Sequence, residues 1–232
     1  MPYIALVVSS AATHAQRLVP ILRTWGRARD GFHLVVVGDD IPALSGARVF
    51  NFSDTTHAAQ RRWPLGLLAL LADAELAEVE WVFVLDDDAF LDHRHVQRLL
   101  SSVSARRPAI YGQRCPSGQF CGGAGWLAHR SVLQRLVPSA AAACNDGGES
   151  YDVCFTRVMG GLGLELVERG EFCSQPPAFY APVDPGGRIR DKEDDGLRAG
   201  MEHAVTFHYI VGLYDELQQR IDHGGRLWPW LR

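Results

Sequence analysis

The chain has 232 residues, of which 47% are hydrophobic and 22% are charged, a composition typical of a globular protein with one large domain or two fused halves. Its 23 Lys and Arg residues are outnumbered by 27 Asp and Glu residues, and the resulting net charge of -4 excludes the strong positive field of a nucleic-acid-binding protein. No apolar stretch approaches the ~20 residues of a membrane span, and the apolar run at 4–8 begins too close to Met1 for a signal peptide.

Short apolar runs alternate with helical patterns along the first third of the chain. Residues 3–8 predict a strand, and a helix is expected from Thr13, with Leu18, Ile21 and Trp25 on one face. The same reasoning predicts further strands at 34–37, 49–52 and 81–85, and a helix at 61–78. Strands that are apolar on both sides and alternate with helices form a mostly parallel sheet, which binds ligands at the carboxyl ends of its strands. We therefore expect an α/β fold.

The rest of the chain carries weaker patterns. Helices are expected at residues 92–104, 131–137, 151–159 and 213–221, and strands at residues 109–113, 164–167 and 203–210. Residues 138–148 predict a loop, and residues 182–200, rich in Pro, Gly and mixed charge, predict a mobile one.

Five cysteines lie at positions 115, 121, 144, 154 and 173, without the spacing of a structural zinc site. Cys115 with Cys121, or Cys144 with Cys154, could form a disulfide in an oxidising compartment. Buried free thiols are the simpler interpretation, because cysteine is among the most buried residue types. The sequence therefore leaves the redox compartment open.

The strongest chemical signal is an apolar run at residues 81–85 that ends in Asp86, Asp87 and Asp88. Three adjacent carboxylates repel one another and persist most easily where a cation offsets their charge. Mg²⁺ and Mn²⁺ prefer such oxygen ligands and commonly share them with a substrate diphosphate. The alternative is a solvated acidic turn before the helix that begins near Asp92.

Three further segments are ambiguous when each is taken alone. Residues 120–126 are rich in glycine between two aromatic residues, which suits close approach of a ligand but also suits a plain turn. Asp152 stands at the start of a predicted helix, where it could act as a general base or, with Ser150, cap the helix. His208 lies within an apolar run, where a histidine is more often a core residue than a metal ligand.

Taken in order, these segments resemble the Fringe-like β-1,3-glycosyltransferases, including the core 1 galactosyltransferase branch. The resemblance spans nearly the whole chain and rests on four segments, WVFVLDDDAF, FCGGAGW, YDVCFTRVMGGLGLELV and VTFHYI, together with the first strand and the turn and helix after it. It implies a GT-A-type, Rossmann-like nucleotide-sugar-binding fold with a mostly parallel central sheet. It also implies a single catalytic domain over residues 1–232, with a nucleotide-binding half at 1–90 and an acceptor-binding half at 91–232.

Carried over residue by residue, the resemblance implies that Asp88 and His208 ligate Mn²⁺, or Mg²⁺ in its place. Asp86 and Asp87 would support the metal or contact the nucleotide ribose. Asp152 would be the catalytic base, with Glu149 as the reserve candidate. The remaining positions implied to contact the substrates are Thr13 and Arg17 at the uridine and diphosphate, Asp39 or Asp40 near the nucleotide, and Gly122, Gly123 and Trp126 between the donor sugar and the acceptor.

The implied reaction is the inverting transfer of a hexose or an N-acetylhexosamine from a UDP-sugar to a hydroxyl of a glycan, glycoprotein or small molecule. The alternatives are a metal-dependent phosphohydrolase or nucleotidyltransferase, and a sugar-nucleotide-binding module without turnover. Family members usually carry an N-terminal membrane anchor and adjacent acids at the helix start, whereas here Tyr151 precedes Asp152. We therefore expect a cytoplasmic protein, such as a bacterial relative, or else the lumenal catalytic domain of a Golgi enzyme without its anchor.

Overall fold

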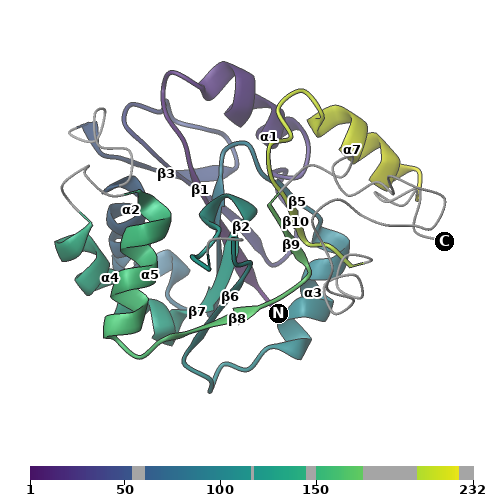
Figure 1. Ribbon diagram of the computed structural model, residues 1–232. Coiled ribbons are helices and arrows are strands. Elements are labelled where there is room, and N and C mark those ends of the chain that lie inside the picture. The colour runs from purple at the N-terminus through teal and green to yellow at the C-terminus, as the bar shows by residue number, and fades with distance from the viewer. Residues whose placement is uncertain (54–60, 116–117, 145–149, 175–202, 225–232) are drawn as a thin grey trace.

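A seven-stranded sheet in the order β3-β2-β1-β4-β7-β6-β8 forms the centre of the computed structural model, which describes residues 1–53, 61–115, 118–144, 150–174 and 203–224 (Figure 1). Its strands are β1 (Tyr3–Val8), β2 (Phe32–Gly38), β3 (Ala47–Asn51), β4 (Trp81–Asp86), β6 (Ala109–Gly112), β7 (Trp126–His129) and β8 (Glu165–Glu168). All neighbouring strands are parallel except β7, which runs antiparallel to both β4 and β6. The expected α/β fold with a mostly parallel sheet is confirmed.

Both faces of the sheet are apolar, because successive side chains of a strand point to opposite faces. In β1, Tyr3, Ala5 and Val7 belong to one core cluster, and Ile4 and Leu6 belong to the other. Helices α2 (Arg62–Ala72), α4 (Arg130–Ala143) and α5 (Tyr151–Gly161) cover the second face. Helices α1 (Val19–Arg23), which follows a π-helical turn at His14–Leu18, α3 (His93–Ser102) and α7 (Tyr214–Asp222) lie on the first (Figure 1).

A small second sheet joins segments that are far apart in the sequence. It contains β5 (Phe90–Leu91), β10 (Thr206–Phe207) and β9 (Phe172–Cys173), with β10 in the middle. Thr206 pairs with Leu91 and Phe207 pairs with Phe90, both in antiparallel register. Since β5 begins two residues after Asp88 and β10 ends one residue before His208, this pairing brings the two residues to the same place.

Most predicted elements are present, with three differences in extent. The helix predicted at residues 61–78 ends at Ala72, because Asp73 turns extended and its side chain caps the next turn. The loop predicted from residue 138 is wrong, since α4 continues through Pro138 to Ala143 on alanines that favour helix. The strand predicted at residues 203–210 shrinks to the two residues of β10. Residues 182–200 lie outside the described residues.

Four of the five cysteines form disulfides, which corrects the preference for free thiols. Cys115 is bonded to Cys121, six positions along the chain, and Cys144 is bonded to Cys154. The second bond links the residue after α4 to the first turns of α5. The fifth, Cys173, is buried in β9. None of the helices that the structure describes has the length and apolar character needed to cross a membrane.

Candidate active site

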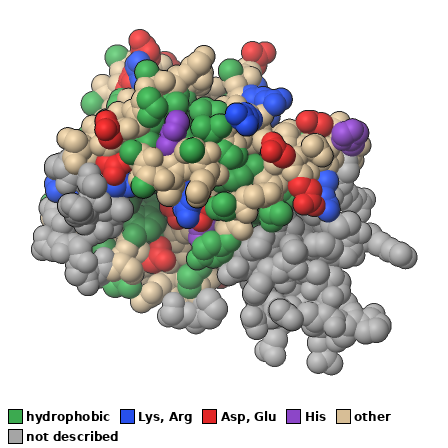
Figure 2. Space-filling model, turned by 90° about the horizontal axis from the view of Figure 1, so that it is seen from above, with side chains coloured by type: hydrophobic (Ala, Val, Ile, Leu, Met, Phe, Trp, Pro, Cys, Tyr) green, Lys and Arg blue, Asp and Glu red, His purple; other side chains and the backbone are tan. Residues whose placement is uncertain are grey.

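The acid-tipped strand β4 ends at the carboxyl edge of the sheet. From Trp81 to Leu85 its side chains are buried, whereas Asp86, the last residue of the strand, has 45% of its side chain exposed. The chain then turns, with the amide of Ala89 donating to the carbonyl of Asp86, and enters β5. Viewed from this edge, acidic, basic and histidine side chains gather in one hollow of the surface (Figure 2).

Asp86, Asp88 and His208 form a cluster whose ligand atoms all lie within 4.8 Å of one another. His208 Nε2 lies 3.0 Å from Asp88 Oδ1 and 3.8 Å from Asp86 Oδ2. The imidazole is held there by the β5-β10 pairing and by the amide of Ile210, which donates to the carbonyl of Asp88. Tyr209, in the left-handed region at φ 56°, packs its ring on that of His208 with the ring centres 3.7 Å apart.

The electrostatics of this cluster suit a cation. Asp88 Oδ1 is buried, and within the described residues it accepts no hydrogen bond despite facing His208 Nε2. A carboxylate oxygen and an imidazole nitrogen this close together can both ligate one metal ion. Two carboxylates and an imidazole form a donor set that Mn²⁺ accepts, and Mg²⁺ shares its preference for the oxygens.

The pKa values of the two carboxyls differ because their partners differ. Burial, and then the charges of Asp88 and Asp87, raise the pKa of Asp86 to about 6, although His208 opposes this. Burial also works to raise the pKa of Asp88, but the contacts with His208 and Arg17 outweigh burial and lower it. The pair therefore carries charge that a cation would stabilise.

Asp87 does not face the cluster as a free carboxylate. Its oxygens accept hydrogen bonds from Ser9 Oγ at 2.8 Å, Thr13 Oγ1 at 2.6 Å and an Arg17 guanidinium nitrogen at 2.9 Å. Thr13 and Arg17, which were expected at the uridine and diphosphate, thus also fix the segment that follows β1 against the acidic turn. Arg17 lies 3.5 Å from Asp88 as well and keeps 34% of its side chain exposed. Its contact with a phosphate stays a prediction.

Asp39, at the end of β2, is buried and bonded within the protein. One oxygen accepts from the amide of Ala11, and the other from the guanidinium of Arg62 at 2.7 Å. Arg62 also donates to the carbonyl of Ser9. Asp39 and Arg62 therefore shape the segment after β1, and a contact between Asp39 and the nucleotide stays a prediction. Ser9 follows the predicted first strand, a positional signal that could have identified it, but no sequence pattern distinguishes Arg62.

Asp152 lies in the first turn of α5 and points to the glycine-rich segment. Its Oδ1 accepts a hydrogen bond from the amide of Gly122 at 2.9 Å, and Ser150 makes no capping bond through its side chain. Ser150 therefore does not cap the helix through its side chain, although Asp152 keeps the first-turn position that the helix dipole favours. Burial raises the pKa of Asp152, while the Gly122 amide and His208 act in the opposite direction. Glu149, the reserve base, lies outside the described residues.

Gly122 and Gly123 lack side chains because other residues occupy that space. A Cβ on Gly122 would lie 2.2 Å from the Tyr151 ring and 2.6 Å from Asp152 Oδ1. A Cβ on Gly123 would lie 2.1 Å from His208 Cε1. Both glycines thus allow the acid of α5 and the distant histidine to approach one backbone segment, rather than only making room for a sugar.

Trp126, expected between the donor sugar and the acceptor, is fully buried. Its indole Nε1 donates to the hydroxyl of Tyr151 at 2.6 Å, and its ring packs on Trp63, so Trp126 supports two residues that line the cavity beside Asp86. Burial, and then the charge of Asp86, raise the pKa of Tyr151 well above its ordinary value. From the sequence, Tyr151 is only a departure from the family's adjacent acids, because a tyrosine at a helix start has no chemical signature of its own.

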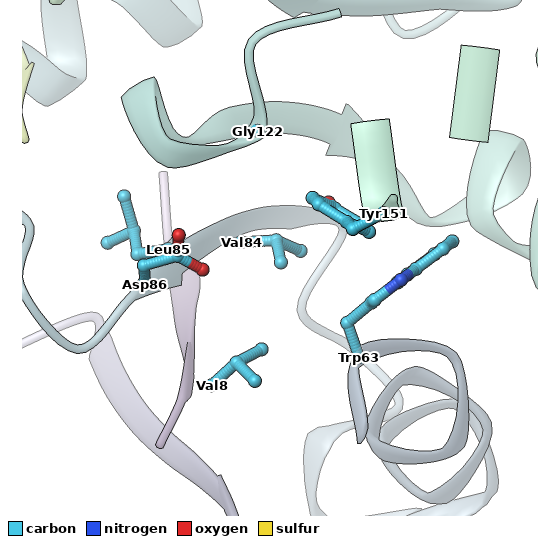
Figure 3. Close-up of a pocket in the computed structure, with 7 residues that line it drawn as sticks. All are labelled: Val8, Trp63, Val84, Leu85, Asp86, Gly122 and Tyr151. Carbon is cyan, nitrogen blue, oxygen red and sulfur yellow. The ribbon is translucent and has the colours of Figure 1, made fainter. Parts of the chain in front are cut away.

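A cavity of about 220 Å³ lies beside Asp86 (Figure 3). Its apolar surface comes from Val8, Val84 and Leu85 at the ends of β1 and β4. Trp63 and Tyr151 form an aromatic side opposite Asp86, and Gly122 closes the lining (Figure 3). Asp86 therefore belongs both to the cluster with Asp88 and His208 and to the cavity.

This sheet, with its acid-tipped strand and a histidine brought to the same edge, defines a GT-A-type α/β fold. Among solved structures, the galactosyltransferase LgtC in complex with donor and acceptor sugar analogues is similar, with a TM-score of 0.56 and 12% identity over 94% of this chain and 95% of that chain. A glycosyltransferase involved in glycosylation of the major capsid of PBCV-1 has a TM-score of 0.56 and 13% identity over 94% of this chain and 100% of that one. At these identities the likeness concerns the fold alone.

The sequence profile of the Fringe-like family matches residues 3–174, and the chain belongs to that family. Glycoprotein-N-acetylgalactosamine 3-beta-galactosyltransferase 1 of Xenopus laevis is 30% identical over 158 residues. That alignment covers 58% of this chain and 43% of the frog protein, so the chain matches less than half of its relative's length. The resemblance to Fringe-like transferases is thereby confirmed.

Proposed function

We propose that the chain is an inverting, metal-dependent glycosyltransferase that moves a hexose or an N-acetylhexosamine from a UDP-sugar to a hydroxyl of a glycan, glycoprotein or small molecule. The observation that supports it most strongly is the meeting of Asp88 and His208, 3.0 Å apart though 120 positions apart in sequence, at the carboxyl edge of the sheet. Membership of the Fringe-like family and the GT-A-type fold agree with it.

Asp86, Asp88 and His208 would hold Mn²⁺, with Mg²⁺ as the alternative. When bound, such an ion would offset the negative charge that develops on the departing diphosphate. Arg17 brings a partly exposed positive charge to the same place, and Ser9 and Thr13 hold Asp87 so that the acidic turn keeps its shape. The nucleotide would then lie along the ends of β1 and β2.

Asp152 is the proposed general base. The acceptor oxygen attacks the anomeric carbon as the bond from that carbon to the diphosphate oxygen breaks, and the acceptor proton passes to the Asp152 carboxylate. This single displacement inverts the configuration and needs no covalent enzyme intermediate. The Gly122 amide orients the Asp152 carboxylate. Because the pKa of Asp152 is raised, this carboxylate is a stronger base than that of an ordinary aspartate.

We further propose that residues 1–90 bind the nucleotide and residues 91–232 bind the acceptor, with His208 of the second half completing the metal site of the first. The disulfides Cys115–Cys121 and Cys144–Cys154 favour an oxidising compartment over the cytoplasm, because such bonds persist where thiols are not kept reduced. They support the lumenal alternative for the location.

Three substitutions test the proposal. Asp88→Ala and His208→Ala should weaken UDP binding in the presence of Mn²⁺, because each would remove one residue that holds the proposed ion. Asp152→Asn should keep that binding and lose transfer by about 10² to 10⁴ in rate. Titration calorimetry with UDP, with and without EDTA, measures the first effect, and UDP release over an acceptor panel measures the second.

Asp30→Asn, in an exposed turn, is the matched control and should behave as the wild type. If Asp88→Ala and His208→Ala bind UDP with wild-type affinity in Mn²⁺, the metal assignment is wrong. If Asp152→Asn transfers sugar normally, the base is another residue. Release of phosphate or nucleotide without any acceptor would instead identify a phosphohydrolase or nucleotidyltransferase.

A further inference from the structure

The residues that line the cavity beside Asp86 include a tyrosine whose hydroxyl already accepts one hydrogen bond from the protein. Trp126 Nε1 donates to the Tyr151 oxygen at 2.6 Å. An indole nitrogen can only donate, so the tyrosine oxygen acts as the acceptor and its own proton must point elsewhere. Within the described residues, no carbonyl or carboxylate accepts that proton in a hydrogen bond. A partly buried donor without a partner is costly, which favours a partner from a ligand.

The Tyr151 ring is fixed by its neighbours. Trp63 meets it edge-on with ring centres 5.0 Å apart, and Phe155 and Phe120 pack at 5.8 Å and 6.1 Å. The ring edge lies where a Cβ of Gly122 would otherwise be. A side chain held on several sides loses little conformational freedom on binding, so its hydroxyl is pre-organised for one direction of hydrogen bond.

The chemistry of the cavity suits one sugar ring. Its volume of about 220 Å³ is below the ~300–1,000 Å³ of pockets for drug-sized ligands, so it accommodates one compact unit rather than a whole nucleotide. Asp86 and Tyr151 supply the side-chain oxygens of the lining, at opposite ends of it (Figure 3). The carboxylate accepts hydrogen bonds and the tyrosine proton is donated, while the other lining residues offer apolar and aromatic surface.

We propose that Tyr151 determines donor-sugar specificity by donating a hydrogen bond to a hydroxyl oxygen of the transferred pyranose, while Asp86 accepts from another hydroxyl of the same ring. This inference rests on the proposed function. It concerns a position at which this chain departs from the Fringe-like pattern of adjacent acids, since a tyrosine precedes Asp152. An ionised acid there could only accept from a sugar, whereas a tyrosine hydroxyl can donate.

The test compares the affinity for UDP with that for UDP-galactose, UDP-glucose and UDP-N-acetylglucosamine, each with Mn²⁺, in the wild type and in Tyr151→Phe. The substitution removes only the hydroxyl. We expect an unchanged Kd for UDP, which also shows that the variant is folded. For the sugar that the wild type prefers, the affinity relative to UDP and the kcat/KM of UDP release should fall about 3- to 10-fold.

Tyr111→Phe is the matched control, because Tyr111 is buried in β6 with its hydroxyl bonded to the backbone of Ser104. It should leave the ratio of affinities unchanged. UDP-sugars that each lack one hydroxyl identify the hydroxyl that Tyr151 contacts. The analogue without that hydroxyl should bind the wild type more weakly than the full UDP-sugar does, and Tyr151→Phe should bind this analogue no more weakly than the wild type does.

The outcomes separate the inference from the function on which it rests. If the wild type binds UDP-sugars and Tyr151→Phe shows the same affinity ratio and the same kcat/KM, Tyr151 does not contact the sugar, and the transferase proposal stands. If the wild type binds none of these donors with Mn²⁺, both proposals fail together.

Discussion

His93 lies at the edge of the sheet opposite the candidate active site, with both ring nitrogens in hydrogen bonds. Nε2 donates to the carbonyl of Trp25 at 2.6 Å, and Nδ1 accepts from the hydroxyl of Tyr3. If Nδ1 took up a proton, it could no longer accept the hydrogen bond from Tyr3. Burial, and then the charge of Arg29, lower the pKa of His93 to about 4. The folded state therefore holds a neutral imidazole.

This imidazole makes stability depend on pH. In the unfolded chain a histidine has a pKa of about 6.5, so between about pH 6.5 and pH 4 the unfolded state binds a proton that the folded state does not. The free energy of unfolding should fall across this range by up to about 3 kcal/mol, from a shift of 1.36 kcal/mol per pKa unit. Urea unfolding at pH 7, 5.5 and 4.5 measures it.

The comparison of two variants isolates His93 from other titrating groups. His93→Gln should lose this part of the pH dependence, whereas His33→Gln, at an exposed position of β2, should retain it. Equal pH dependence in His93→Gln and the wild type would contradict the assignment.

At the scale of elements, the turn formed by Gly122–Ala124 contacts the proposed base through one residue and the proposed metal ligand through the next. We expect Gly123→Ala to displace His208 and weaken Mn²⁺-dependent UDP binding by about tenfold or more, since overpacking typically costs about 1–3 kcal/mol. Gly122→Ala should displace Tyr151 and Asp152, reducing transfer while leaving that binding intact. Calorimetry and UDP release distinguish the two variants.

Gly160→Ala provides the control for these alanines. Gly160 lies in α5 and a Cβ there would meet nothing within 4 Å, so the substitution should be neutral or slightly stabilising. If Gly123→Ala binds UDP with Mn²⁺ as tightly as Gly160→Ala does, the close approach of Gly123 and His208 does not contribute to UDP binding.

At the scale of the whole molecule, the disulfide Cys144–Cys154 links two helices that cover one face of the sheet. Closing a loop of 10 residues restricts the unfolded chain, and removing the bond should lower the free energy of unfolding by about 3 kcal/mol. The double variant Cys144→Ala/Cys154→Ala tests this by urea unfolding. Dithiothreitol should destabilise the wild type more than this variant, and equal effects would show that the bond does not form in solution.

The sequence predicted those parts of the fold in which local pattern and tertiary role agree. β4 was predictable because a continuous apolar run ends abruptly in acids, and β1 because its residues are aliphatic throughout. β5, β9 and β10 have two residues each and no periodicity, so their pairing depends on tertiary contacts. α4 passes through Pro138 because the helix formers on either side outweigh one lost hydrogen bond.

The candidate site divides in the same way. Asp88 and His208 were paired through the order of motifs, and their proximity follows from a sheet that the sequence did not reveal. The approach of Gly123 to His208 and the direction of the Tyr151 proton depend on packing in three dimensions. The sequence indicated both cysteine pairs as possible disulfides, but six- and ten-residue spacings occur with and without such bonds, so it did not decide whether they form.

The reversed direction of β7 decides which of its two flanking segments lies at the edge of the sheet that carries the acids of β4. If β7 were parallel to β4, only the residues that follow it in sequence would lie at the carboxyl edge of the sheet. Because β7 is antiparallel, the residues that precede it, 122–125, lie at that edge instead. With four residues at about 3.3 Å each, a β7 of the opposite direction would leave this backbone ~13 Å away, at the far rim. One inverted strand therefore brings the acids that leave β4 and the glycine segment that enters β7 to the same edge of the sheet.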